Sequence, residues 1–177
     1  MTASSEKKVS NLLHVFRYRV DFHDTTQGKA DKPGSNPVCS GKFSEVTGFE
    51  ASMEPFTFQQ GGQNWGEIQR AGKTTFATLV LKRGMTEDRA LWQWFHGFAT
   101  GAYAYRLTAT VTVLNPAQAA NEAKGTLAWQ FANCVPVKLK AADLSASASE
   151  IGIEELHLNH EGMELYTDGI QAAGGGA

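Results

Sequence analysis

The stretch YAYRLTATVTVL (residues 103–114) decides the fold class of this 177-residue chain. Alternate positions form an apolar set and a small polar set, and the polar set consists of Ala104, Arg106, Thr108, Thr110 and Thr112. A β-strand points successive side chains to opposite faces, so this pattern predicts a strand with one buried face. The second face carries hydroxyls and one cation but no carboxylate. We therefore expect it to stay wet, as the lining of a wide barrel does.

The rest of the chain predicts a mainly β fold with one helix. Alternating or apolar runs predict strands over residues 14–22, 38–49, 51–59, 73–83, 125–132, 134–140 and 145–160. In the stretch 73–83 both parities are apolar, which predicts burial on both faces. Thr86 is a candidate N-cap for a helix over about residues 87–99, and Gly101 a candidate stop. The expected architecture is an antiparallel β-barrel or sandwich with one α-helix and long loops.

The last predicted strand contains an irregular apolar pattern. Ile151 and Ile153 share odd parity, whereas Leu156 and Leu158 share even parity. An extra residue at positions 154–155 would bring all four to one face, so we predict a β-bulge there. The alternative is that the sheet changes its buried side at this point.

Length and composition indicate one domain, over residues 12–167, with flexible ends at 1–11 and at the Gly-rich 168–177. The net charge of −2 gives no basic footprint for nucleic acid. No apolar run reaches the roughly 18 residues that a membrane anchor needs. We find no signal-peptide core and expect synthesis and assembly in the cytoplasm, where Cys39 and Cys134 would be free thiols and not a disulfide.

The titratable residues do not form a catalytic or metal-binding pattern. On a strand, His157 and His160 would point to opposite faces, and neither cysteine has the close companion of a zinc site. Glu154, Glu155 and Glu161 fit a charged rim better than an acid/base pair. No zinc, phosphate-loop or serine-nucleophile motif occurs. We therefore expect no enzyme activity, no cofactor and no metal.

Three tryptophans are candidates for contacts. Trp65 lies in a polar loop, either as an anchor for a partner or tucked back onto its own domain. Trp92 and Trp94 lie about 200° apart on the predicted helix at 100° per residue. One of these two is expected in the core, which leaves the other available to a neighbouring subunit.

Three segments occur in a characteristic order: FSEVTGFEASMEPFTFQQGGQNW (43–65), LVLKRGMTEDRALWQWF (79–95) and WQFANCVPVKLKAADLSASASEIGIEELHLNHEGMEL (129–165). Together they resemble the phage tail tube protein family, the inner tube subunits of contractile phage tails and of phage-tail-like contractile injection systems. The resemblance covers most of residues 16–165. The loop at residues 24–37 is longer than expected for the family.

The resemblance implies six-fold rings whose inner strands form one β-barrel around a lumen. The rings would stack into a hollow tube, which a contracting sheath drives through a target envelope as part of a tail-like particle acting outside the cell. The implied partners are other copies, a sheath protein, baseplate or spike and tube-terminating proteins, and cargo in the lumen. The lumen-facing residues would be Arg106, Thr108, Thr110 and Thr112, with Arg106 as the one charged member. An inter-ring arm would cover residues 50–72 and include Glu54, Gln60, Gly61, Gly62, Asn64 and Trp65.

Two other functions remain open from the sequence. One is a specialised, baseplate-proximal tube-end paralogue of the same family. The other is a monomeric β-barrel module that holds a small ligand in the barrel mouth. In that module the polar face of residues 103–114 would close around a pocket, whereas in a tube it would be open to solvent.

Overall fold

The computed structural model describes residues 14–24, 39–59, 61–62, 65–101, 106–114, 125–145, 149 and 151–167. The expected flexible ends, residues 1–11 and 168–177, lie outside these ranges. So do residues 25–37 of the long loop and residues 103–105 of the alternating stretch 103–114.

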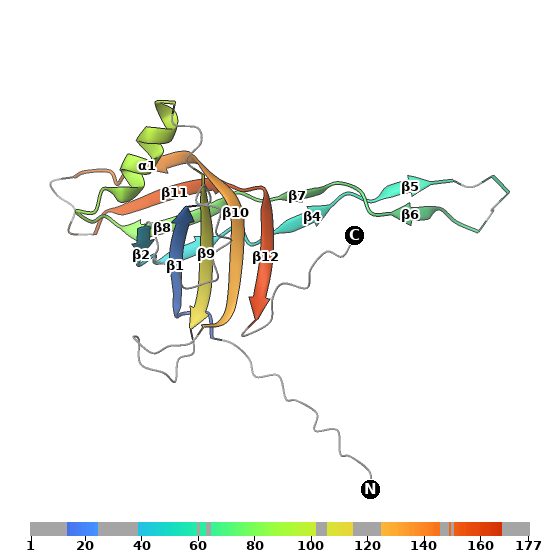
Figure 1. Ribbon diagram of the computed structural model, residues 1–177, viewed down its shortest axis with the longest axis horizontal. Helices are drawn as coiled ribbons and strands as arrows, with labels where there is room; N and C mark the ends of the chain where they lie inside the picture. Colours follow the sequence, from blue (N-terminus) through green and yellow to red (C-terminus); the bar gives the residue numbers. More distant parts are fainter. Residues whose placement is uncertain are drawn as a thin grey trace, which may run out of the picture.

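The described part of the chain is mainly β with one helix, as predicted. The strands are β1 (Tyr18–Asp24), β2 (Cys39–Gly41), β3 (Glu45–Thr47), β4 (Ala51–Met53), β5 (Phe56–Phe58), β6 (Ile68–Arg70), β7 (Thr74–Phe76), β8 (Leu79–Gly84), β9 (Leu107–Leu114), β10 (Gly125–Lys140), β11 (Ile153–Asn159) and β12 (Gly162–Thr167), and the helix is α1 (Ala90–Ala99). Figure 1 shows a body of two sheets with α1 at one side and a long, narrow arm built from β4–β7.

Strand β10 joins the two sheets of the body. Its first part, up to Cys134, pairs with β9 and β12, and its second part, from Val135 onward, pairs with β11. The first sheet has the order β2-β1-β9-β10-β12 and the second the order β10-β11-β8-β3, with every pairing antiparallel. Pairing does not close on itself among the described strands, so the single chain is a sandwich. The register of β10 shifts between Phe131 and Cys134, where Asn133 has a φ of 53°.

The core lies between the sheets and under the helix. Fully buried side chains come from both sheets and include Phe22, Phe131, Leu79, Leu81, Leu156 and Leu158. Helix α1 adds Leu91 and Trp94, and the Trp94 ring lies 5.6 Å from that of Phe22. Burial of each such side chain contributes about 1.5–3 kcal/mol. Trp92 is 53% exposed, which confirms that one of the two helical tryptophans enters the core.

The helix starts later than predicted, and Thr86 is not its N-cap. It begins at Ala90, whose backbone N–H donates to Oδ1 of Asp88 at 3.0 Å. Asp88, and not Thr86, therefore supplies the side-chain oxygen that accepts a backbone hydrogen bond at the start of the helix. The stop at Gly101 is confirmed by its φ of 114°, a conformation that glycine adopts without strain.

The predicted β-bulge at residues 154–155 is wrong. Strands β11 and β8 pair in unbroken register from Ile153 opposite Gly84 to Leu158 opposite Leu79. Ile151 precedes the strand, and both isoleucines are exposed. The buried face needs only Leu156 and Leu158, so no change of buried side is required either.

The predicted strand over residues 73–83 is two strands. Strand β7 belongs to the arm and β8 to the body, with residues 77–78 between them. Burial alternates along β8, so only one of its faces is buried and the expectation of two is wrong. Gly48 explains the close approach at this junction: a Cβ there would lie 2.2 Å from the carbonyl oxygen of Thr78, and its φ is 102°.

Candidate assembly surfaces

The arm is a two-stranded β-ladder that leaves the body. Its base pairs β4 with β7, and its outer part pairs β5 with β6. The sequence predicted an arm over residues 50–72, but it predicted a loop beyond residue 59 and therefore missed β6. Gly61 and Gly62 lie near the tip, Glu54 lies between β4 and β5, and Gln60 and Asn64 fall outside the described residues.

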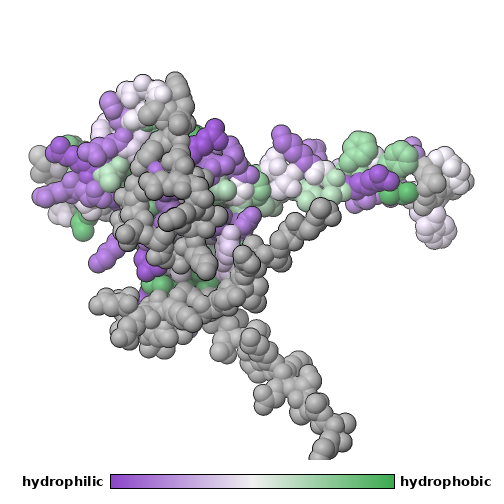
Figure 2. Space-filling view, in the orientation of Figure 1, coloured by the Kyte–Doolittle hydropathy of each residue, from purple (hydrophilic) through white to green (hydrophobic). Residues whose placement is uncertain are grey.

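Each part of the arm has one polar face, and the opposite face of the outer part is mostly apolar. Cross-strand partners share a face: Ser52 and Thr75 are hydrogen-bonded at 2.8 Å, and Thr57 lies opposite Gln69. The other face of the outer part carries Phe56, Phe58, Ile68 and Arg70, and both phenylalanines are exposed. Figure 2 shows this apolar surface as green patches along the arm. A two-stranded ladder of this kind is marginally stable in water by itself.

Trp65 sits at the tip of the arm and is 96% exposed. It does not tuck back onto its own domain, one of the two alternatives that the sequence left open. A fully exposed indole at the end of a projecting arm is typical of an anchor for a partner.

The second face of the first sheet is polar. Arg19, Asp21 and His23 of β1 lie opposite Thr112, Thr110 and Thr108 of β9, respectively. The Arg19 Nε atom is 2.7 Å from Asp21 Oδ2, so this face carries an ion pair as well as hydroxyls. Thr110 and Thr112 are 2% and 6% exposed in the single chain. Strand β9 is therefore largely buried on both faces, and the expectation that its polar face is open to solvent is wrong for the single chain. The lumen position of these threonines in a ring stays a prediction.

Arg106 has a structural partner that the sequence did not indicate. It lies just before β9, and its guanidinium donates to the Glu161 carboxylate. The same carboxylate accepts from Nδ2 of Asn133 at 2.7 Å, and the Glu161 N–H donates to the Ala132 carbonyl at 3.0 Å. The hydrogen bonds from Asn133 and Arg106 lower the pKa of Glu161. Glu161 thus ties the start of β9 to the bend in β10.

His160 connects the arm to the body. Its ring lies 4.9 Å from that of Phe131 in β10 and 5.3 Å from that of Phe76 at the arm base. The Nδ1 atom is 3.0 Å from the Gly162 carbonyl oxygen, and burial lowers the pKa of the imidazole. His157 instead lies beside Glu155, 3.5 Å away. The two histidines thus have separate structural surroundings.

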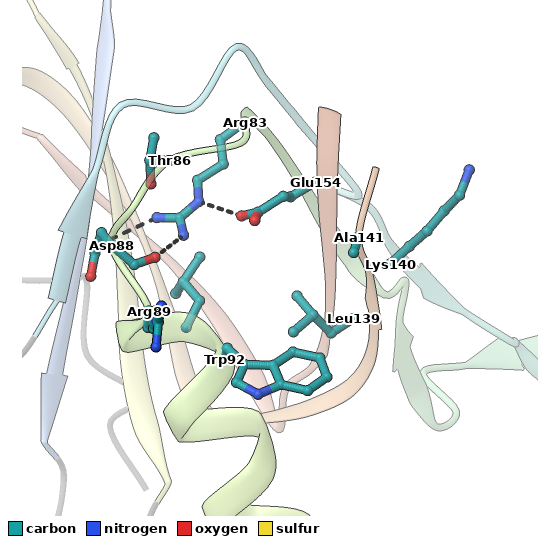
Figure 3. Close-up of a pocket in the computed structure, with 10 residues that line it drawn as sticks. Arg83, Thr86, Asp88, Arg89, Trp92, Leu139, Lys140, Ala141 and Glu154 are labelled. Atoms are coloured by element: carbon teal, nitrogen blue, oxygen red, sulfur yellow. Dashed lines mark hydrogen bonds and ion pairs between the residues drawn. The ribbon is translucent and has the colours of Figure 1, made fainter. Parts of the chain in front are cut away.

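A pocket of about 310 Å³ lies between the start of α1 and the ends of β8, β10 and β11. Figure 3 shows Trp92 and Leu139 along one side and Arg83 with Glu154 along another, while the Lys140 ammonium points away. The Trp92 indole, half-exposed on the helix, forms part of the wall. The pocket therefore combines an apolar surface with fixed charges.

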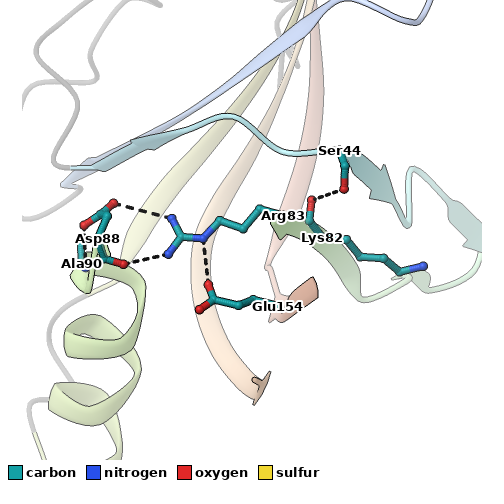
Figure 4. Close-up of polar contacts among 6 residues, drawn as sticks. All are labelled: Ser44, Lys82, Arg83, Asp88, Ala90 and Glu154. Carbon is teal, nitrogen blue, oxygen red and sulfur yellow. Dashed lines mark hydrogen bonds and ion pairs between the residues drawn. The ribbon is translucent and has the colours of Figure 1, made fainter. Parts of the chain in front are cut away.

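The charged part of this pocket is an ion pair centred on Arg83, whose side chain is 5% exposed. Its Nε donates to Glu154 Oε2 at 3.0 Å, and its Nη2 donates to the Asp88 carbonyl at 3.0 Å (Figure 4). Arg83 thereby links the second sheet to the residue that precedes α1. The prediction that Glu154 lies on a charged rim is wrong, because even positions of β11 face inward.

Comparisons with known proteins now add to this geometry. The sequence matches the family of the T4-like virus tail tube protein gp19 over residues 14–164. This chain belongs to that tail tube family. No curated protein sequence matches it significantly.

Solved structures with the tail tube fold are similar over nearly the whole chain. A chain of the anti-feeding prophage baseplate, solved by cryo-EM, has 20% identity and a TM-score of 0.71, with 91% of this chain and 99% of that chain covered. A chain of the PVC extracellular contractile injection system sheath-tube complex in the extended state has 17% identity and a TM-score of 0.70, with 94% and 99% covered. The crystal structure of an Hcp protein has 11% identity, a TM-score of 0.51, and coverage of 85% and 92%. These likenesses show the fold.

Chemistry-bearing side chains of this tail tube protein remain scattered in the part that the structure describes. No group of three or more His, Cys, Asp or Glu residues there is placed to hold a metal ion. Cys134 is a buried free thiol, and burial raises its pKa to about 12. No helix within the same residues is long and apolar enough to cross a membrane.

Proposed function

We propose that this protein is the repeating inner-tube subunit of a contractile phage tail or injection particle. Six copies form a ring, and rings stack into a hollow, rigid tube that conducts cargo when a sheath contracts. The polar face of the first sheet, which includes Arg106, Thr108, Thr110 and Thr112, lines the channel.

The two-sided character of the first sheet carries this proposal. One face packs Val20, Phe22 and Phe131 into the core, and the other carries the Arg19–Asp21 pair and three threonines, of which Thr110 and Thr112 are buried in the single chain. At its edges, β12 pairs only with β10 and β2 only with β1 among the described strands. Open strand edges invite further pairing, and a closed ring of copies removes them.

The arm supplies a second surface for the same assembly. It projects from the body and keeps an apolar face that its own chain leaves exposed. In a stacked tube such an arm reaches from one ring to the next. The sheath, the baseplate or spike, and the tube-terminating protein are the further partners. The tube assembles in the cytoplasm and acts in a tail-like particle outside the cell.

Electron microscopy of the purified protein, alone and co-produced with its sheath and baseplate partners, tests the proposal. Six-fold hollow rings or tubes are expected. Particles in which this chain occupies only the end of the tube would favour the tube-end paralogue. A strict monomer at high concentration in both preparations would overturn the proposal and favour the ligand-binding module.

The lumen residues have their own test. A Thr108→Cys variant in assembled tubes should react with a small maleimide that enters the channel and resist a maleimide coupled to a large polyethylene glycol. Equal reaction with both reagents would place this face on the outside. A Gln69→Cys variant on the arm serves as the control, because it reports how both reagents react with a cysteine at another position of the same protein.

A further inference from the structure

Two features have no counterpart among the residues that the structure describes: the exposed indole at the arm tip and the pocket beside α1. In Figure 1 the arm extends away from the body on the side opposite to α1, beside which the pocket lies. Strand β8 begins at Leu79, next to the arm base, and runs to Gly84 at the pocket end, a distance of roughly 20 Å for six extended residues. Trp65 at the end of the arm lies still farther away, so it cannot reach the pocket of its own chain.

The pocket has the chemistry to hold an indole. Trp92, Leu91, Leu139 and Ala141 supply apolar surface for the ring. Arg89 supplies a guanidinium group, which stacks favourably on aromatic faces, whereas the Arg83 guanidinium is held by Glu154 and Asp88. The Glu154 carboxylate, 20% exposed, retains acceptor capacity for an indole N–H while it holds Arg83. A volume of about 310 Å³ lies at the lower end of the range for small-ligand pockets and is large enough for one aromatic side chain.

We propose that Trp65 of one copy docks into this pocket of a second copy. The inference rests on the proposed function, because it names the surface that receives the arm. A contact between two different surfaces at opposite ends of one chain is heterologous, and repetition of it joins copies head to tail. It also accounts for the amphipathic arm, since docking brings Phe56 and Phe58 against the neighbour.

Cross-linking tests which two surfaces meet. Trp65→Cys and Arg89→Cys are made as separate proteins in a Cys39→Ser background, where the remaining Cys134 is buried. The mixture is expected to form a disulfide-linked heterodimer on mild oxidation. The matched control pairs Arg89→Cys with Gln69→Cys, on the polar face of the arm. Cross-linking of the Trp65→Cys mixture no faster than the control would overturn the proposal.

Assembly of variants provides an independent readout. Trp65→Ala removes the anchor and Ala141→Trp fills the pocket, so each alone should lower tube yield at least tenfold. Trp65→Phe keeps the apolar body and loses the donor, and it should be intermediate. Thr57→Ala, on the polar face, should assemble like the unmodified protein. Normal tubes from both Trp65→Ala and Ala141→Trp would contradict docking while leaving the tube proposal intact.

These experiments distinguish a failure of the tube proposal from a failure of the docking proposal. If the unmodified protein forms no rings or tubes, the tube proposal fails. The cross-linking comparison then still decides whether arm and pocket meet in a simple head-to-tail pair.

Discussion

Two neighbouring residues of β8 allow a sharp comparison of a buried with an exposed ion pair. Arg83 and Lys82 each have a carboxylate partner at 3.0 Å, Glu154 and Glu45, respectively. Arg83 faces inward with a 5% exposed side chain, whereas Glu45 is half-exposed on the opposite face. The perturbation is Glu154→Gln, matched with Glu45→Gln. Both remove one charge at the same distance and keep the shape of the side chain.

The expected effects differ severalfold. Removal of one partner from a fully buried pair costs about 3–5 kcal/mol because the other charge is left uncompensated. Glu154 is 20% exposed, and the Asp88 carboxylate, with Oδ2 3.6 Å from Arg83 Nη1, remains in the variant. Water and Asp88 offset part of this penalty, so we expect about 2–3 kcal/mol. For Glu45→Gln we expect a much smaller loss, because water screens an exposed pair. In a domain of this size the larger value lowers Tm by about 4–12 °C.

Urea unfolding and thermal scans at one fixed, dilute protein concentration measure these differences, because assembly would otherwise add to apparent stability. A double variant, Arg83→Leu with Glu154→Leu, should recover most of the loss, since an apolar pair leaves no buried charge behind. Equal effects of Glu154→Gln and Glu45→Gln would refute the reasoning that Arg83 is held in a desolvated site.

Three further predictions follow from single residues. Folding lowers the pKa of Glu161, so the stabilisation by this carboxylate is present above the usual pKa of 4.5 and is lost as the pH falls through the pKa of the folded state. The Glu161→Gln variant should therefore be less stable than the unmodified protein at pH 7 and equally stable in strong acid. Urea unfolding midpoints measure this difference. Burial raises the pKa of the Cys134 thiol to about 12, so in a Cys39→Ser background a thiol reagent at pH 8 should label it only in urea; rapid labelling of the native protein would contradict this burial. Gly48→Ala should lower Tm because its backbone is left-handed and a carbonyl fills the Cβ position, whereas Gly97→Ala, in open space on the helix, should stabilise by up to about 1 kcal/mol.

The predictable parts of the fold were those set by periodicity. Alternation in residues 107–114 predicted strand β9, and the helix pattern predicted the separate positions of Trp92 and Trp94. Alternation did not predict that Thr110 and Thr112, on the polar parity of β9, are buried in the single chain as well. The prediction of a β-bulge was wrong because it rested on the assumption that Ile151 and Ile153 are buried. A sequence pattern does not show whether an apolar residue at or just before the start of a strand is buried or exposed.

The candidate surfaces were predictable only in outline. The arm was placed from family resemblance, but its second strand β6 (Ile68–Arg70) lacks an alternating pattern and was missed. The Arg83–Glu154 pair and the clamp by Glu161 join residues about 70 and 55 positions apart. Such contacts depend on strand register, which a single sequence does not encode locally. A signal existed for one of them: Glu154 has the same parity as the buried Leu156 and Leu158.

The most direct test of the central claim is a reconstruction of the assembled protein by electron cryomicroscopy. The account predicts a hollow six-fold ring whose inner wall consists of β1, β9, β10 and β12, with Thr108, Thr110 and Thr112 facing the channel. A ring whose inner wall is formed by β8 and β11, or a particle with no channel at all, would contradict it.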